Sequence, residues 1–156
     1  MSLQVLRPGL LMTVQDMGRH GHQHVGLCPG GAMDPLALTL AKISADEAVA
    51  LHAGSDYRVL MIGFAPGHAY IGGLNPKLSV PRRAAPRAIV PEGSVAIAND
   101  QTVIYPYAIS GGWSIIGRTP LTVFDAERQE PSLFAAGDRV RFKPISRAEF
   151  QKLIAQ

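Results

Sequence analysis

Three arginines stand close together in a proline-rich stretch, and they are the clearest candidates for chemistry in this chain. Arg82 and Arg83 follow Pro81, and Arg87 follows Pro86. Proline restricts the backbone, so neighbouring arginines lose little entropy when they are held in one direction. Guanidinium groups bind carboxylates and phosphates in a fixed, often bidentate geometry. The pattern predicts a binding site for a small anionic ligand. The alternative is a solvated loop with structural salt bridges.

The segment GFAPGHAYIGGL, residues 63–74, lies just upstream and is a second candidate. It is not a nucleotide P-loop, because the terminal Gly-Lys-Ser/Thr is missing. Its histidine could act as an acid or base, and a tolerated ring substitution is the simpler interpretation. Glycine and proline fix unusual backbone geometry at a shaped surface. We expect ligand-binding roles for Gly63, Pro66, Gly67, His68 and Tyr70.

Aromatic and glycine residues follow two later turns and could complete the same surface. Tyr105 closes one apolar run, and Gly111, Gly112 and Trp113 open the next. Large aromatic rings with a polar end often line pockets, but they also serve as ordinary core residues. We assign these four residues to ligand binding, with plain core packing as the alternative.

His20, His22 and His24 alternate along the chain, so in an extended strand they share one face. Imidazoles placed in this way can bind zinc or nickel. The sequence fixes no carboxylate or thiolate beside them, although Cys28 lies four residues on. A polar strand face is therefore favoured, and no metal site is predicted. Pairing of Cys28 with one of the histidines as a nucleophile is a weaker alternative.

Composition indicates one globular domain over residues 1–156. Apolar residues make up 47% of the chain and charged residues 17%, which is typical of a folded domain. A net charge of +3 with 6% aromatic residues weighs against nucleic acid binding. The single cysteine excludes an internal disulfide. No signal peptide pattern and no run of about 18 apolar residues is present, so we expect no membrane contact and a cytoplasmic location.

Apolar patterning and turn residues predict many short strands and three short helices. Asn99 and Asp100 are expected to form a tight hairpin turn. Many short strands with frequent turns favour a closed or sandwich-like β architecture. Capping by Asp34, Ser44 and Ser146 places helices at 35–43, 45–53 and 146–155. Strands are predicted at 3–6, 10–14, 57–62, 94–98, 102–105, 113–116, 121–124 and 139–142.

Several ordered motifs carry a family resemblance: YRVLMIGFAPGHAYIGGL, PRRAAPR, GSVAIA, QTVIYP, GGWSIIGRTPL and GDRVRF. Over about residues 45–150 the chain resembles the C-terminal domain of the B subunit of bacterial 5-oxoprolinase, also known as a kinase-inhibitor or allophanate hydrolase subunit 1 type. This implies a mainly β fold, a cyclophilin-like closed β-barrel with a few short helices. Residues 1–43, with PGLLMTVQD and GGAMDP, are similar to the start of the C subunit of the same enzyme. The chain is then a chimera joined near residues 43–45, or a natural compact paralogue.

The resemblance also implies an activity. The family's enzyme uses ATP and Mg²⁺ to phosphorylate the lactam carbonyl of 5-oxoproline, and the ring is opened to glutamate. Arg82, Arg83, Arg87 and Gln101 would be the catalytic residues that this domain contributes, balancing phosphate charge. Backbone N–H groups of the glycine loop would hold the carboxylate. No general base is evident in the sequence, and no tightly bound cofactor is expected.

Departures from the family pattern lower the expectation of activity in the chain alone. The family tends to have Gly-Gly at Asn99 and Asp100, Gly at Val103 and Pro at Ser110. A kinase-inhibitor-type regulatory module and an inert recombined or engineered scaffold are therefore alternatives to an enzyme subunit. The expected partners are the other 5-oxoprolinase subunits, or a second copy of the chain through a segment swap.

Overall fold

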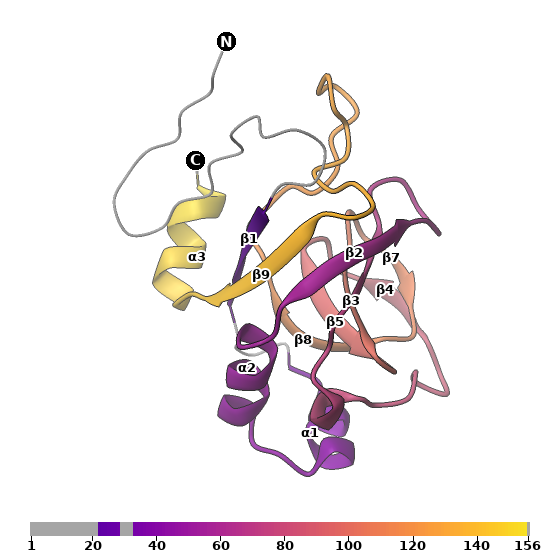
Figure 1. The fold of residues 1–156 in the computed structure, drawn as a ribbon, viewed down its shortest axis with the longest axis vertical. Coiled ribbons are helices and arrows are strands. Elements are labelled where there is room, and N and C mark those ends of the chain that lie inside the picture. The colour runs from indigo at the N-terminus through magenta and orange to yellow at the C-terminus, as the bar shows by residue number, and fades with distance from the viewer. Residues whose placement is uncertain (1–21, 29–32, 156) are drawn as a thin grey trace.

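A single curved sheet of seven strands dominates the computed structural model, which describes residues 22–28 and 33–155. The strands run in the order β1-β9-β2-β3-β6-β5-β8, and the sheet curls into the barrel seen in Figure 1. Its two edges meet where Cys28 and Arg118 exchange backbone hydrogen bonds of 2.8 and 3.2 Å. The predicted closed β-barrel is confirmed. The strands of this sheet are β1 (His22–Leu27), β2 (Tyr57–Ile62), β3 (Ala69–Gly72), β5 (Ser94–Ala98), β6 (Gln101–Ile104), β8 (Ser114–Arg118) and β9 (Arg139–Pro144).

Most neighbouring strands are antiparallel, and one pair is parallel. β1 runs parallel to β9, whereas β9, β2, β3, β6, β5 and β8 pair in antiparallel fashion. The β5–β6 hairpin turns at Asn99, which has a φ of 52°, a conformation that asparagine tolerates. A separate ribbon of β4 (Arg87–Val90) and β7 (Ile109–Gly111) lies over part of the barrel's outer face.

Alternate residues of the strands divide the apolar side chains between two cores. Val95 and Ile97 of β5 face the larger core inside the barrel, to which all seven strands contribute. Ala96 and Ala98 face a smaller core on the outer side, together with Val103 and residues of the β4–β7 ribbon. Both faces of β5 are therefore covered, which explains why all five of its residues are buried.

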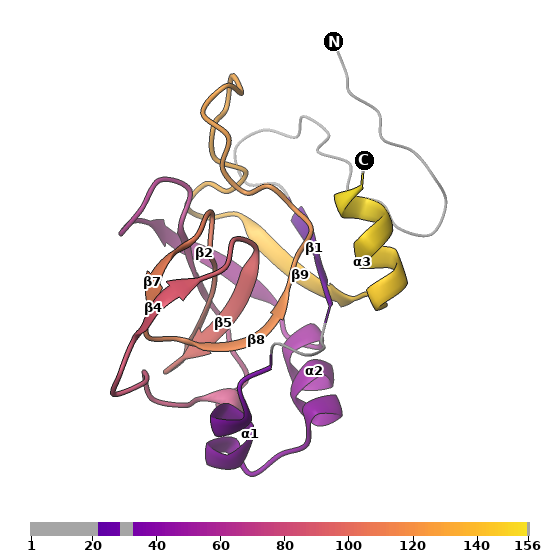
Figure 2. The same ribbon diagram turned by 180° about the vertical axis from the view of Figure 1, so that it is seen from behind.

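Three α-helices of the described residues lie against the barrel, and their caps agree with the sequence prediction. Asp34 accepts a hydrogen bond from the Leu36 N–H at the start of the first helix, and Ser146 forms a full capping box with Glu149 at the last. Figures 1 and 2 show the first two helices together beneath one end of the barrel and the third beside β1 and β9. The helices are α1 (Pro35–Ala41), α2 (Ala45–Ala53) and α3 (Arg147–Ile154), with a 3-10 turn η1 (Pro76–Leu78).

The side chain of His52, near the end of α2, packs inside the barrel. It is fully buried, and its Nε2 lies 3.1 Å from the hydroxyl oxygen of Thr102. That hydroxyl donates its own proton to the Ala96 carbonyl at 3.0 Å, so the Nε2–H of His52 is the donor to Thr102. Burial lowers the pKa of His52 to about 3, and the ring is neutral at ordinary pH.

Some predicted strands differ from those observed. The strand predicted at 121–124 is wrong, since these residues form only an isolated bridge between Phe124 and Ser132. The strands predicted at 3–6 and 10–14 lie outside the described residues. Four observed strands were not predicted, namely β1, β3, β4 and β7, because glycine, histidine or short length weakens their apolar alternation. Among the described residues, none of the helices has the length and apolarity to cross a membrane.

Candidate functional site

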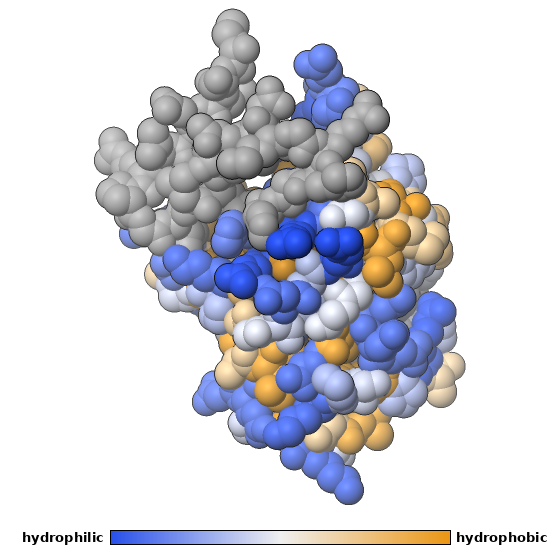
Figure 3. All heavy atoms as spheres, viewed as in Figure 1, coloured by the Kyte–Doolittle hydropathy of each residue, from blue (hydrophilic) through white to orange (hydrophobic). Residues whose placement is uncertain are grey.

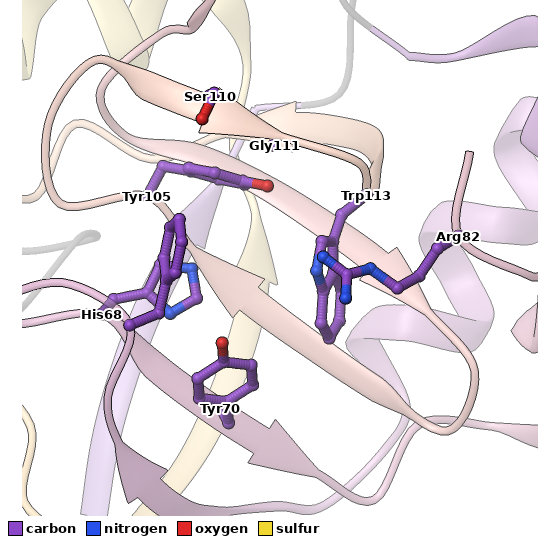
Figure 4. Close-up of a pocket in the computed structure, with 8 residues that line it drawn as sticks. His68, Tyr70, Arg82, Tyr105, Ser110, Gly111 and Trp113 are labelled. Atoms are coloured by element: carbon purple, nitrogen blue, oxygen red, sulfur yellow. The ribbon is translucent and has the colours of Figure 1, made fainter. Parts of the chain in front are cut away.

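A shallow hollow lies on the outer face of the barrel, between the β2–β3 loop and the β4–β7 ribbon. The space in and above it, open solvent included, is about 230 Å³. The enclosed part is much smaller, so the hollow is a surface depression rather than a closed cavity. Figure 4 shows side chains from separate parts of the chain converging on it. The lining residues are Phe64, His68, Tyr70, Arg82, Tyr105, Ser110, Gly111 and Trp113.

Small residues beneath the ribbon make room for the aromatic walls. Ala96 and Ala98 present only methyl groups to the outer core, where Tyr105 and Trp113 pack. Gly111 is required for a different reason: a Cβ at this position would collide with the Tyr105 hydroxyl. The ribbon can therefore approach Tyr105 closely only because residue 111 has no side chain.

Aromatic rings form a continuous wall around His68. Its ring lies edge to face with Phe64 at 5.4 Å, Tyr70 at 4.9 Å and Tyr105 at 5.4 Å between centroids. Tyr70 in turn lies 6.0 Å from Trp113. In Figure 4 the hydroxyl groups of Tyr70 and Tyr105 point into the space between His68 and Trp113. The wall offers ring faces for apolar contact and two hydroxyl groups for orientation.

His68 is neutral in this environment. Burial lowers its pKa to about 4, and its Nδ1 is buried with no hydrogen-bond partner among the described residues. A neutral imidazole cannot serve as a proton donor of ordinary strength at pH 7. The geometry therefore favours the interpretation of His68 as a ring in the pocket wall over that of an acid catalyst.

Arg82 supplies positive charge to the hollow. Its guanidinium carbon lies 5.9 Å from the centre of the Trp113 ring, a cation–π arrangement. No ion pair links Arg82 to any described carboxylate. Burial raises the pKa of Tyr105, and the charge of Arg82 opposes this effect. Arg82 is thus a cation beside an aromatic wall and available to an anionic ligand.

Arg83 and Arg87 have a different arrangement, because both are paired with Asp34. Their guanidinium nitrogens lie 2.6 and 2.9 Å from one oxygen of that carboxylate, whose side chain is only 4% exposed. Burial acts to raise the pKa of Asp34, but hydrogen bonds from Arg87, the Leu36 N–H and Arg83 outweigh it and leave the pKa lowered. These two arginines follow the salt-bridge alternative of the sequence analysis.

The same two arginines hold the turn that carries Trp113. The backbone N–H of Arg83 donates to the Gly112 carbonyl at 2.7 Å, and the Arg87 guanidinium donates to the Trp113 carbonyl at 3.2 Å. Asp34 therefore positions Trp113 through its partners. Sequence reasoning assigned Asp34 only to helix capping and missed this function, since no local pattern links residues so far apart.

The other predicted residues lie outside the hollow. Gly63 donates its N–H to the His68 carbonyl at 3.0 Å, and Pro66 is exposed in the same loop. Gly67 has a φ of +75° and is packed so closely on Phe124 that any side chain would clash. Gln101 starts β6, opposite Gly72, whereas Tyr105 follows the other end of that strand. Gln101 is thus separated from the hollow by the length of β6.

Two lining residues, Phe64 and Ser110, were not among the predicted site residues. Both flank predicted ones, Gly63 and Gly111, and proximity to a glycine-rich loop is the signal that could have found them. For metals, no group of three or more potential ligands occurs in residues 22–28 and 33–155. His20 and the side chain of His22 lie outside the described part, and His24 is exposed on β1.

A closed β-barrel with a pocket on its outer face defines the class of domain. The chain belongs to the family described as the carboxyltransferase domain, subdomain C and D, whose model matches residues 34–134. The match already begins at Asp34, so α1 and its cap lie within the family region. The predicted origin of residues 1–43 in the C subunit of 5-oxoprolinase stays a prediction.

Named relatives make the likeness more specific. The chain is 40% identical over 129 residues to the B subunit of 5-oxoprolinase from Bacillus subtilis (strain 168), covering 81% of this chain and 54% of that protein. It is 48% identical over 118 residues to the B subunit of 5-oxoprolinase from Escherichia coli O157:H7, covering 74% and 54%. The chain spans about half the length of these curated relatives.

A solved structure agrees with this fold. The crystal structure of the conserved uncharacterized protein PH0987 from Pyrococcus horikoshii superposes with a TM-score of 0.78 at 39% identity, covering 83% of this chain and 61% of that one. The curated relatives confirm the resemblance to the B subunit of 5-oxoprolinase that the motifs predicted.

Proposed function

We propose that this chain is the barrel domain of a subunit of an ATP-dependent 5-oxoprolinase and that the hollow binds 5-oxoproline. The observation that carries the proposal is the guanidinium of Arg82 above Trp113, unpaired with any described carboxylate, beside an aromatic wall. The relatives, which are named as 5-oxoprolinase subunits, supply the substrate class. 5-Oxoproline is a small lactam ring with one carboxylate, and each part has a partner in the hollow.

Charge and shape give the ligand one orientation. The carboxylate meets Arg82, because a guanidinium binds a carboxylate by charge-assisted hydrogen bonds. The ring lies against the aromatic wall around His68, and the hydroxyl of Tyr70 or Tyr105 reaches the lactam carbonyl. Arg83 and Arg87 take no direct part, because their guanidinium groups are held against Asp34 and neither residue lines the hollow. Catalytic roles proposed for these two arginines are therefore replaced by a positioning role.

The nucleotide needs a different location. No carboxylate lines the hollow, and the two buried aspartates are engaged elsewhere, Asp34 with its arginines and Asp138 with the Ala135 N–H at 2.8 Å. Mg²⁺ prefers carboxylate oxygens and phosphates, so the lining of the hollow does not fit Mg-ATP. We assign the binding of ATP and Mg²⁺ to the other subunits of the enzyme, with which this chain assembles in the cytoplasm. In this proposal the lactam carbonyl is phosphorylated by ATP that those subunits hold.

The chain offers an internal probe of this proposal, because Trp113 is its single tryptophan. Titration with 5-oxoproline should change Trp113 fluorescence and saturate. Arg82→Gln should weaken binding by up to about fivefold, since Arg82 is exposed and an exposed ion pair contributes about 0.2–1 kcal/mol. Arg147→Gln, on exposed α3, is the matched control and should bind like the parent. Equal binding by the Arg82 and Arg147 variants, or no response in the parent chain, would contradict the proposal.

A further inference from the structure

Phe64 carries two unfavourable features at once. It has a φ of 71°, in the left-handed region that bulky residues rarely adopt. Its side chain is also 69% exposed, so the strain is not offset by burial of the ring. Strained conformations that packing does not explain are concentrated at ligand sites. In Figure 3 hydrophobic side chains gather at the side of the molecule where β2 ends.

The two other described non-glycine residues of positive φ, Lys42 and Asn99, have ordinary structural explanations. Lys42 forms the left-handed cap of α1, with its N–H bonded to the Leu38 and Thr39 carbonyls, a common helix ending. Asn99 lies in the β5–β6 turn and belongs to a residue type that tolerates this region. Phe64 has neither explanation, and a glycine at the same place would be easier to accommodate.

The loop around Phe64 is closed firmly on both sides. The Gly63 N–H donates to the His68 carbonyl at 3.0 Å, and the His68 N–H donates to the Ala65 carbonyl at 3.0 Å. Pro66 and the left-handed Gly67 at the centre of this turn match a type II β-turn. The backbone is therefore fixed, and the left-handed φ directs the Phe64 ring to the mouth of the hollow.

From this position the ring stands edge to face against His68, at 5.4 Å between centroids. It lines the same hollow as Arg82, which lies over Trp113. The aromatic face of Phe64 and the cation of Arg82 thus border the same space. A ligand that fills this space needs an apolar ring face to contact Phe64 and a carboxylate to bind Arg82.

We propose that Phe64 is a specificity-determining residue, whose ring covers the apolar face of a small ring-shaped carboxylate held by Arg82. The inference rests on the proposed site and deepens it. The Phe64 side chain selects five-membered ring carboxylates over open-chain carboxylates of similar charge, because only a ring offers a flat apolar face to Phe64. Its left-handed backbone is the feature that holds the ring there.

Opposite effects on stability and binding test this inference. Phe64→Gly should leave the melting temperature unchanged or raise it, because glycine adopts the left-handed region without strain. It should weaken binding of 5-oxoproline and of cyclopentanecarboxylate by at least about fivefold, since the contact of an aromatic ring contributes about 1 kcal/mol. Binding of acetate should not change. Ile89→Ala is the control, because Ile89 is equally exposed at 69% but does not line the hollow.

Trp113 fluorescence gives the dissociation constants, and a thermal melt of each variant gives the stability. Binding of ring carboxylates by Phe64→Gly within twofold of the parent would overturn the inference, as would a fall in its melting temperature of more than a few degrees. If cyclopentanecarboxylate binds in a Phe64-dependent way and 5-oxoproline does not bind, the proposed substrate fails and the inference stands. If neither ring carboxylate binds the parent chain, both fail.

Discussion

Asp34 and Arg83 are 49 positions apart in the chain, yet the Asp34 carboxylate accepts a hydrogen bond of 2.6 Å from the Arg83 guanidinium. The same carboxylate caps α1 through the Leu36 N–H and receives a second guanidinium from Arg87. One side chain thereby connects the start of a helix with the arginine-rich loop. Through that loop it reaches Trp113 on the wall of the hollow.

Asp34→Asn should destabilise the chain by about 1–3 kcal/mol, because it leaves two arginines without their shared anion. Asparagine retains the capping oxygen, so the variant tests the loss of the negative charge alone. Thermal melts should show a melting temperature lower by roughly 2–12 °C, and Trp113 fluorescence should shift as its turn relaxes. Asp56→Asn is the control, because its pair with Arg141 at 2.7 Å is exposed and such pairs contribute little. Equal melting temperatures for the two variants would contradict the structural role of Asp34.

Gly111→Ala should damage the hollow, since the added methyl group would collide with the Tyr105 hydroxyl. We expect a loss of about 1–3 kcal/mol in the free energy of unfolding, typical of forced overpacking. Gly112→Ala is the neighbouring control, because a Cβ there would meet nothing closer than 3.7 Å. Urea denaturation of both variants makes the comparison. A Gly111 variant as stable as the Gly112 variant would show that Tyr105 can move away freely.

His68 makes stability depend on pH in the acid range. Its pKa is about 4 in the folded chain and about 6.5 when unfolded, so only the unfolded chain binds a proton between these values. The stability that this difference provides is complete above pH 6.5 and falls as the pH is lowered toward 4, by up to about 3 kcal/mol. His68→Phe should remove this part of the dependence and raise stability near pH 5. His52 contributes similarly in the parent chain and in the His68→Phe variant. The measurement is therefore the difference between their melting temperatures as a function of pH. A difference that stays constant across pH would contradict the assignment to His68.

Activity of the isolated chain is a separate prediction. Supplied with 5-oxoproline, Mg-ATP and potassium, it should release phosphate no faster than without 5-oxoproline. The hollow has no carboxylate in its lining to hold Mg²⁺ beside ATP, and the chain spans about half the length of its relatives. A complete 5-oxoprolinase serves as the positive control. Substrate-dependent phosphate release that disappears in Arg82→Gln would show that this chain carries the catalytic machinery by itself.

The fold could be predicted from sequence where local signals were strong. Ser44, Ser146 and Asp34 marked all three helices through their caps, and β2 and β5 were predicted with their observed bounds because their apolar residues are dense. Strands rich in glycine or histidine, such as β1 and β3, gave no clear alternation. The apolar residues at 121–124 led to a wrongly predicted strand, because Val123 is buried without being part of a strand.

The site could be predicted only in composition. The motifs indicated His68, Tyr70, Arg82, Tyr105, Gly111 and Trp113, which the structure brings to one hollow. They could not separate Arg82 from its neighbours Arg83 and Arg87, because the difference depends on Asp34 in a distant segment. The left-handed backbone of Phe64 was equally hidden, since an ordinary phenylalanine predicts no positive φ.

The parallel pairing of β1 with β9, together with the Cys28–Arg118 bridge, has a consequence for biosynthesis. The two strands lie at opposite ends of the described chain, so the barrel can close only after β9 has left the ribosome. Until then β1 has no partner on that side, and the edge of β2 that later binds β9 is also open. Unpaired edges of this kind recruit other chains. The nascent protein therefore passes through a stage in which β1 must be kept from neighbouring copies, and chaperone dependence during synthesis is the expected result.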